Sequence, residues 1–237
     1  MTAAGDELAA HWSGYSRGPD GFHAADQAAM APVRGNFSTG RIASPWIGPI
    51  FAGNTFLLQL NGGHKEGDNT YDTALPLQEC LSGTENNFLL DPPPKRNDMA
   101  LDPAGHPGVT YWKRFLRSAV QDLESILGLS SDVIRKRAAR ITTFVQLVPY
   151  NSSTYPGRLE PMTLRSTQLI ARYIKEDIIP RAKRGDALVL VHRAQRQWAL
   201  TESRGVVFGK NPRLSSLTRP ERDALVNWWA KQLPNIR

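Results

Sequence analysis

The chain has 237 residues, 41% hydrophobic and 22% charged, a balance that suits one large folded domain and excludes a disordered protein. Lysine and arginine total 29 against 22 aspartate and glutamate, so the net charge of +7 favours polyanionic partners such as nucleic acid. The single cysteine, Cys80, excludes an intrachain disulfide and any zinc site with two thiolates. The N-terminus lacks the basic and apolar regions of a signal peptide, and no run of residues reaches membrane-spanning length. We therefore expect a cytoplasmic protein with no membrane association.

The first third of the chain predicts little regular structure. Residues 1–50 are rich in glycine, alanine, serine and proline, with a short helix around residues 7–12. We expect them to form an arm packed on the core, with residues 51–237 forming a single domain. The first strand is predicted over residues 55–60, an apolar run typical of a parallel sheet covered on both faces. Residues 88–107 contain LDPPPKRND and are expected to form a surface or substrate-facing loop.

The rest of the chain predicts alternating helices and strands. In order, these are a helix at residues 111–127 ended by Gly128, a basic helix at 132–140, a strand at 141–149, a helix at 164–179, strands at 186–191 and 204–209, and a final helix whose capping box is Thr218 with Glu221. This alternation predicts a three-layer α/β/α sandwich around a mostly parallel four-stranded sheet. Ligands of such sheets bind beyond the carboxyl ends of the strands. The loops to consider are therefore LNGGHKEGD (60–68), PYNSSTYPG (149–157), HRAQRQW (192–198) and GKNPRLSS (209–216).

Each of these four loops is similar to a motif of one family, the uracil-DNA glycosylase superfamily. QLNGGH at residues 59–64 resembles the water-activating GQDPYH of the uracil-specific branch and the GINPG or GMNPG of the mismatch and single-strand branches. TFVQ at 143–146, followed by PYNS, takes the place of the base-reading LLLN strand. VLVHRAQRQ at 189–197 resembles LLWG-x-x-AQKKG, and NPRLSS at 211–216 resembles the DNA-entering HPSPLS loop. The resemblance covers about residues 50–235 and rests on the order and spacing of the four motifs together.

The resemblance implies a monofunctional enzyme that flips a nucleotide out of DNA and hydrolyses the bond between deoxyribose and base, without metal or other cofactor. Such a reaction needs a placed water and hydrogen-bond donors aimed at the leaving base. Asn61 is the candidate that positions the water, with His64 assisting. The sequence leaves the general base open among Glu66, Asp68 and Asp72, with Asp68 as our candidate.

The resemblance also implies which side chains contact the base and the DNA. Expected at the base are Gln59, Gly63, Phe88, Gln146 and Asn211. Expected at the DNA are His192, Arg193, Gln195, Lys210, Arg213, Leu214, Ser215 and Ser216, with Leu214 filling the vacated stack. Gln146 stands where the uracil branch has asparagine, Asn211 where it has its leaving-group histidine, and Gly63 where it has a tyrosine beside pyrimidine C5. These differences predict a roomier pocket for uracil or a C5-modified pyrimidine, such as a modified cytosine of phage DNA.

Other interpretations stay open from the sequence. Asn61 alone is typical of a turn amide after a strand, Phe88 of a core aromatic, and Gln146 of a side chain that binds backbone at a sheet edge. His64 with Asp68 offers too few ligands for a metal site, and the G-x-S-x-G elbow of an α/β hydrolase is absent from the chain. The alternative function is a DNA-binding module that kept the scaffold and lost the chemistry. We expect a monomer that acts on double- or single-stranded DNA, in repair or in antiviral defence.

Overall fold

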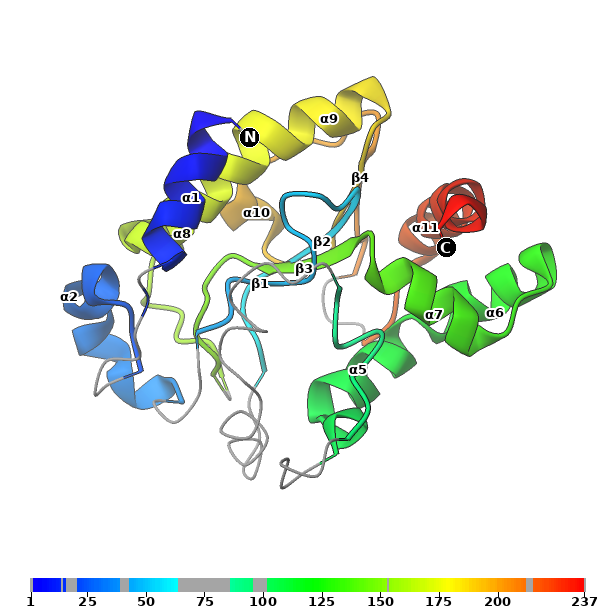
Figure 1. The fold of residues 1–237 in the computed structure, drawn as a ribbon. Helices are drawn as coiled ribbons and strands as arrows, with labels where there is room; N and C mark the ends of the chain where they lie inside the picture. The colour runs from blue at the N-terminus through cyan, green and yellow to red at the C-terminus, as the bar shows by residue number, and fades with distance from the viewer. Residues whose placement is uncertain are drawn as a thin grey trace.

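In the computed structural model the chain folds around one mixed sheet of five strands, in the order β1-β3-β2-β4-β5 (Figure 1). The strands are β1 (Trp46–Ile47), β2 (Thr55–Gln59), β3 (Thr142–Gln146), β4 (Leu188–Val191) and β5 (Val206–Phe208). The structure describes residues 2–13, 15, 21–38, 43–63, 86–95, 102–152, 154–211 and 215–236.

The four predicted strands are parallel to one another. β2 pairs with β3 on one side and β4 on the other, and β4 pairs with β5. The fifth strand, β1, pairs antiparallel with β3 and was not predicted. It has only two residues, too few to show the alternation by which a strand is recognised in sequence. The predicted α/β class and mostly parallel sheet are confirmed, with an added antiparallel edge.

The helices connect these strands and cover the sheet. They are α1 (Ala3–Ser13), α2 (Gln27–Met30), α5 (Pro107–Phe115), α6 (Arg117–Leu127), α7 (Ser131–Ala139), α8 (Arg165–Tyr173), α9 (Ile179–Arg184), α10 (Gln195–Trp198) and α11 (Arg219–Gln232). Short 3-10 helices lie at Ala24–Asp26, Ala31–Asn36, Pro103–Gly105, Pro161–Thr163 and Leu233–Asn235. In the described part of the chain, no helix has the length and apolar character needed to span a membrane.

Two helices that the sequence predicts as continuous are divided in the structure. The helix expected at residues 111–127 begins earlier, where His106 caps α5 by accepting a backbone N–H, and it breaks at Leu116 into α5 and α6. Gly128 ends it in the left-handed conformation, as predicted, with φ of 65°. The helix expected at 164–179 becomes α8, a π-helical turn and α9. Pro180, which has no N–H, lies just beyond that turn, and a wider turn accommodates the missing donor.

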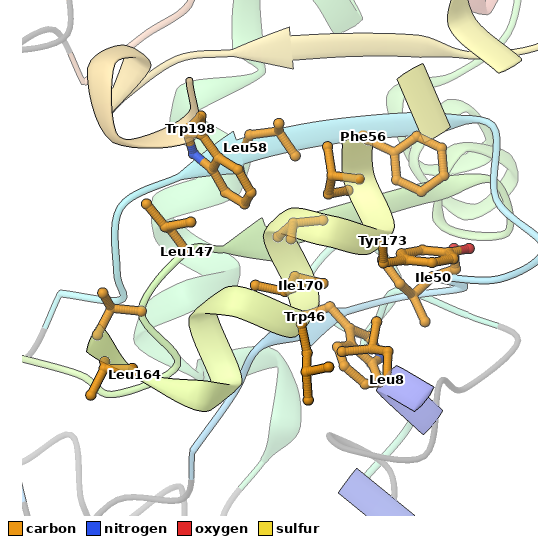
Figure 2. Close-up of a cluster of buried hydrophobic side chains, with 14 of the residues drawn as sticks. Leu8, Trp46, Ile50, Phe56, Leu58, Leu147, Leu164, Ile170, Tyr173 and Trp198 are labelled. Carbon is orange, nitrogen blue, oxygen red and sulfur yellow. The ribbon is translucent and has the colours of Figure 1, made fainter. Parts of the chain in front are cut away.

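Side chains that alternate along the strands fill two hydrophobic clusters, one on each face of the sheet. Figure 1 shows α1, α8 and α9 on one side of the sheet, and α5, α6, α7 and α11 on the other. In β2, Phe56 and Leu58 face the α8 side, whereas Leu57 faces the α5 side. Leu8 and Trp46, from the N-terminal residues, lie within the α8-side cluster (Figure 2). The first fifty residues therefore contribute directly to one of the two hydrophobic clusters.

Candidate site at the carboxyl edge of the sheet

The four parallel strands end level with one another. Gln59 at the end of β2 is paired with Gln146 at the end of β3, and Val191 at the end of β4 lies between Leu58 and Phe208. The loops that follow these strands therefore leave the sheet at one edge, its carboxyl edge. The described residues that follow the strand ends most closely, which we call the candidate site, are 59–63, 146–152, 192–195 and 209–211.

Asn61, the candidate for positioning a water, is half-buried and held through its side-chain nitrogen. Nδ2 donates to Oγ of Ser152 at 2.7 Å and to the backbone oxygens of Gly62 at 3.1 Å and Tyr150 at 3.4 Å. Carbonyl oxygens only accept hydrogen bonds, so these contacts determine which end of the amide faces the protein. Oδ1 has no hydrogen-bond partner among the described residues, which leaves it able to accept a proton from water.

Gln146 is oriented by the backbone of the neighbouring loop. Its Oε1 accepts the N–H of Gly62 at 2.8 Å, and because a backbone N–H only donates, Nε2 must be the other end of the amide. This is the backbone contact that the sequence left open, and it occupies only the oxygen. A β-carbon on Gly62 would lie 1.7 Å from Oδ1 of Asn151 and 3.1 Å from Nε2 of Gln146. A β-carbon at position 62 would therefore force the side chain of Asn151 to move where the two loops meet.

Gln59 and Gly63 complete the first loop. Gln59 lies beside Gln146 across the sheet, and its Nε2 is buried without a hydrogen-bond partner among the described residues. Its backbone oxygen accepts from Nε1 of Trp198 at 3.2 Å. A β-carbon on Gly63 would meet no atom of the described residues within 4 Å, so the described part of the chain leaves space beside this residue. The edge therefore presents amide donors from Gln59 and Gln146 and an acceptor from Asn61.

His192, an expected DNA contact, follows β4 directly and points into the protein. Its side chain is fully buried, and Nδ1 lies 2.8 Å from Oε1 of Glu221, which is also fully buried. Its ring packs edge-on against Phe115, with ring centroids 4.7 Å apart. A buried partner on α11 therefore keeps the imidazole of His192 inside the protein, whereas the expected contact with DNA would need it at the surface.

The other expected contacts in the last two loops differ in exposure. Four of them are exposed: Lys210, Asn211, Ser215 and Ser216. Arg193 is half-buried, and its Nε makes no hydrogen bond to the described residues. Gln195 donates from Nε2 to the backbone oxygens of Val191 and Gly209. Gln195 therefore joins the third loop to the fourth, and its nitrogen is used within the protein.

Phe88, expected to stack on a base, is anchored near the other end of the sheet. Its neighbour Asn87 donates from Nδ2 to the backbone oxygen of Thr142, the first residue of β3, at 3.1 Å. Gln146 lies four residues further along that strand, about 13 Å away. The Phe88 ring packs against the α5-side cluster and edge-on to His106, with centroids 5.7 Å apart. The structure does not bring Phe88 to the candidate site. Packing against the α5-side cluster accounts for an aromatic residue at this position.

Part of the predicted site lies outside the described residues. This part comprises the candidate catalytic residues His64 and Asp68, the alternative bases Glu66 and Asp72, and the DNA contacts Arg213 and Leu214. Within the ranges that the structure describes, no group of three or more histidine, cysteine, aspartate or glutamate side chains is gathered as a metal site would need. What the described site offers chemically is amide, hydroxyl and backbone groups.

Sequence reasoning missed the role of residues 150–152, which we call the support segment. The oxygens of Tyr150 and Ser152 hold Asn61, and the side chain of Asn151 contacts Gly62. PYNS was recognised in the sequence as a loop after a strand, but nothing local indicates that it braces the loop after β2. That contact depends on the pairing of β2 with β3, which joins residues far apart in the chain.

A cavity of about 290 Å³ lies between α5, α7 and residues 90–92. It is lined by Leu90, Asp91, Pro92, Lys113, Asp132, Val133, Arg135 and Lys136. Arg135 is paired with Asp132 at 2.5 Å. None of the lining residues belongs to the four loops, so this cavity forms no part of the candidate site.

The candidate site thus consists of two ordered amides, Asn61 and Gln146, at the ends of adjacent parallel strands, with open space beside Gly63. A scan against protein-family models, a search of curated proteins and a search of solved structures each found no match to the chain. Its function is therefore inferred from its own residues and their contacts.

Proposed function

We propose that this protein is a monofunctional DNA glycosylase that hydrolyses the bond between deoxyribose and a pyrimidine base, uracil or a C5-modified pyrimidine. The observation that carries the proposal is the orientation of Asn61, whose nitrogen is bound by three oxygens and whose Oδ1 is left as an acceptor at the carboxyl edge. An amide does not remove a proton from water, but it orients the water by accepting one in a hydrogen bond. As the bond between the sugar C1′ and the base breaks, the base leaves as an anion. The water oxygen bonds to C1′ of the oxocarbenium-like sugar, and the proton that the water loses passes to solvent.

The two glutamines support a site for the base. With its oxygen bound to Gly62, Gln146 presents an N–H donor, and Gln59 holds a second donor beside it. Donors of this kind suit the carbonyl oxygens of a pyrimidine and the charge that develops on them as the base leaves. The space beside Gly63 is compatible with a substituent on C5 of the ring.

The charge of the chain supports a polyanionic substrate. The net charge of +7 favours DNA, and Lys210 is exposed in the loop after β5, at the same edge as Asn61. A base buried in a duplex is out of reach of this edge, so the target nucleotide would have to be flipped or be single-stranded.

The proposal is tested by looking for the freed base. Purified protein is incubated with single- and double-stranded DNAs that contain uracil or various C5-modified pyrimidines, and released bases are identified by mass spectrometry. We expect release from at least one DNA, with an alkali-labile abasic site. Asn61→Ala should lower the single-turnover rate at least about 100-fold, as expected when one positioned catalytic dipole is lost. Asn227→Ala, which removes an exposed amide of α11, is the matched control and should behave like the wild type.

The outcomes separate the proposal from its alternative. Salt-sensitive DNA binding without base release from any of the DNAs would identify a DNA-binding module without chemistry. Base release that is unchanged in Asn61→Ala would refute the role of Asn61 while leaving the enzyme class standing. If the protein neither binds DNA nor releases a base from it, the proposal is refuted.

A further inference from the structure

The support segment lies between the first loop of the candidate site and the N-terminal residues. On one side, the N–H of Ser152 donates to the backbone oxygen of Gly62 at 3.1 Å. On the other side, Ser152 forms an antiparallel bridge with Phe37, and the N–H of Ser38 donates to the oxygen of Asn151 at 2.9 Å. Phe37 and Ser38 thus bind the support segment on the side away from the first loop.

Tyr150 is the buried anchor of this arrangement. Its hydroxyl donates to Oδ2 of Asp26 at 2.6 Å and accepts the N–H of His23 at 3.1 Å. Asp26 is fully buried, and its Oδ1 accepts the N–H of Ser166, at the start of α8, at 3.2 Å. Burial raises the pKa of Tyr150 above its usual value. At neutral pH the hydroxyl therefore keeps its proton and donates a hydrogen bond to Asp26.

The same tyrosine reaches the candidate site through its backbone, since its carbonyl oxygen accepts from Nδ2 of Asn61 at 3.4 Å. We propose that Tyr150 is a positioning residue, through which the docking of residues 21–38 determines the orientation of Asn61. Residues 21–38 then contribute to the candidate site by positioning Asn61 through Tyr150. The effect on base release rests on the proposed function, whereas the mechanical link from Asp26 to Asn61 does not.

Two buried tyrosines allow this link to be separated from a simple loss of stability. Tyr150→Phe removes the hydroxyl that binds Asp26. Tyr173→Phe removes a hydroxyl of similar burial, which donates from α8 to the backbone oxygen of Ile50 at 3.2 Å. Within the described residues, the hydroxyl of Tyr173 makes no hydrogen bond to the support segment, so this variant is the matched control.

The two variants are compared by NMR in the full chain. In Tyr150→Phe we expect the backbone N–H of Ser152 to exchange at least about tenfold faster, because a loosened support segment opens more often. We also expect the side-chain NH₂ resonances of Asn61 to shift. In Tyr173→Phe both should match the wild type. On a DNA from which the wild type releases a base, Tyr150→Phe should lower kcat for base release with little change in KM.

Each outcome decides one part of the proposal. Unchanged Asn61 resonances in Tyr150→Phe, or equal exchange of Ser152 in the two variants, would overturn the link. Faster exchange with normal kcat would overturn the positioning role. If the wild type releases no base, the proposed function fails while the NMR comparison still decides the link. Should Tyr150→Phe not fold, Asp26→Asn replaces it with the same expectations. The carboxylate of Asp26 has two acceptor oxygens, one for Tyr150 and one for Ser166, whereas the asparagine amide has only one.

Discussion

The orientation of Asn61 follows from a difference between the two ends of an amide. Two of its three partners are carbonyl oxygens, which accept only its nitrogen, so Oδ1 is turned away from the protein. Gln146 is oriented in the opposite sense by a backbone N–H, which binds only its oxygen. An acceptor and a donor therefore lie at the same edge. Gln146 is oriented by a backbone N–H, and Asn61 by two backbone oxygens and the hydroxyl of Ser152.

Gly62 and Gly63 are adjacent glycines that differ in the space around them among the described residues, so one serves as the control for a substitution of the other. In Gly62→Ala the new methyl group would collide with the buried side chain of Asn151, so we expect a loss of about 1–3 kcal/mol in the free energy of unfolding. Gly63→Ala meets no atom within 4 Å and should change stability by less than about 0.5 kcal/mol. Urea unfolding monitored by fluorescence measures both. Equal losses in the two variants would contradict the packing described for Gly62.

At the scale of elements, the start of α11 is tied to the end of β4. Glu221 accepts from the backbone N–H of Thr218 at 2.8 Å and from its hydroxyl at 2.6 Å, and its other oxygen binds His192. The capping box predicted from the sequence is thus present, and its carboxylate has a second function in the fold. One side chain both caps a helix and satisfies a buried imidazole.

This double role predicts a large effect for one carboxylate of α11 and a small one for another. Glu221→Ala should lower the free energy of unfolding by about 3 kcal/mol, because the cap is lost together with the buried hydrogen bond between Glu221 and Nδ1 of His192. Asp223→Ala, two residues later, removes a carboxylate that lies at the surface and should cost less than about 0.5 kcal/mol. Denaturant unfolding at neutral pH distinguishes the two. Similar losses would show that the contact with His192 contributes little.

At the scale of the whole molecule, the N-terminal residues are held to the core by a polar cluster as well as by apolar packing. Nε2 of His11, on α1, lies 2.9 Å from Oγ of Ser166 on α8, and its ring stacks on His23 at 3.9 Å. Burial, followed by the neighbouring His23, lowers the pKa of His11 from 6.5 to about 4. Of the charged neighbours, Arg165 also lowers it, while Asp26 and Glu7 oppose the shift.

A pH dependence of stability follows from this shift. The folded pKa lies below the unfolded one, so between pH 6.5 and about 4 the unfolded chain binds more protons and stability falls as the pH falls. In His11→Gln this loss should be smaller by about 1–2 kcal/mol, a figure reduced because the ring is only half-buried. Urea unfolding across this pH range tests it, with His106→Asn as a variant that retains His11 and should retain the loss. Parallel curves for the wild type and His11→Gln would exclude this contribution.

Local pattern was enough to determine the elements that repeat over several residues. The apolar runs at residues 55–60 and 186–191 form β2 and β4, the capping box starts α11, and Gly128 ends α6. From the order of these elements follow the parallel sheet and the edge at which its four loops gather. Periodicity carries this information because each strand or helix must present its apolar side to a neighbouring layer.

Only the tertiary structure decided the contacts between segments distant in the chain. The orientation of Asn61, the burial of His192 against Glu221 and the anchoring of Phe88 near the start of β3 each depend on residues from another element. The same holds for the N-terminal residues, which look like an arm in sequence yet brace the support segment. A hydrogen bond between distant residues leaves no periodic trace in the sequence, because it depends on a few atoms at one point of contact. The amino acids alone thus determined the four parallel strands and the edge at which their loops gather, and packing determined which groups are exposed at that edge.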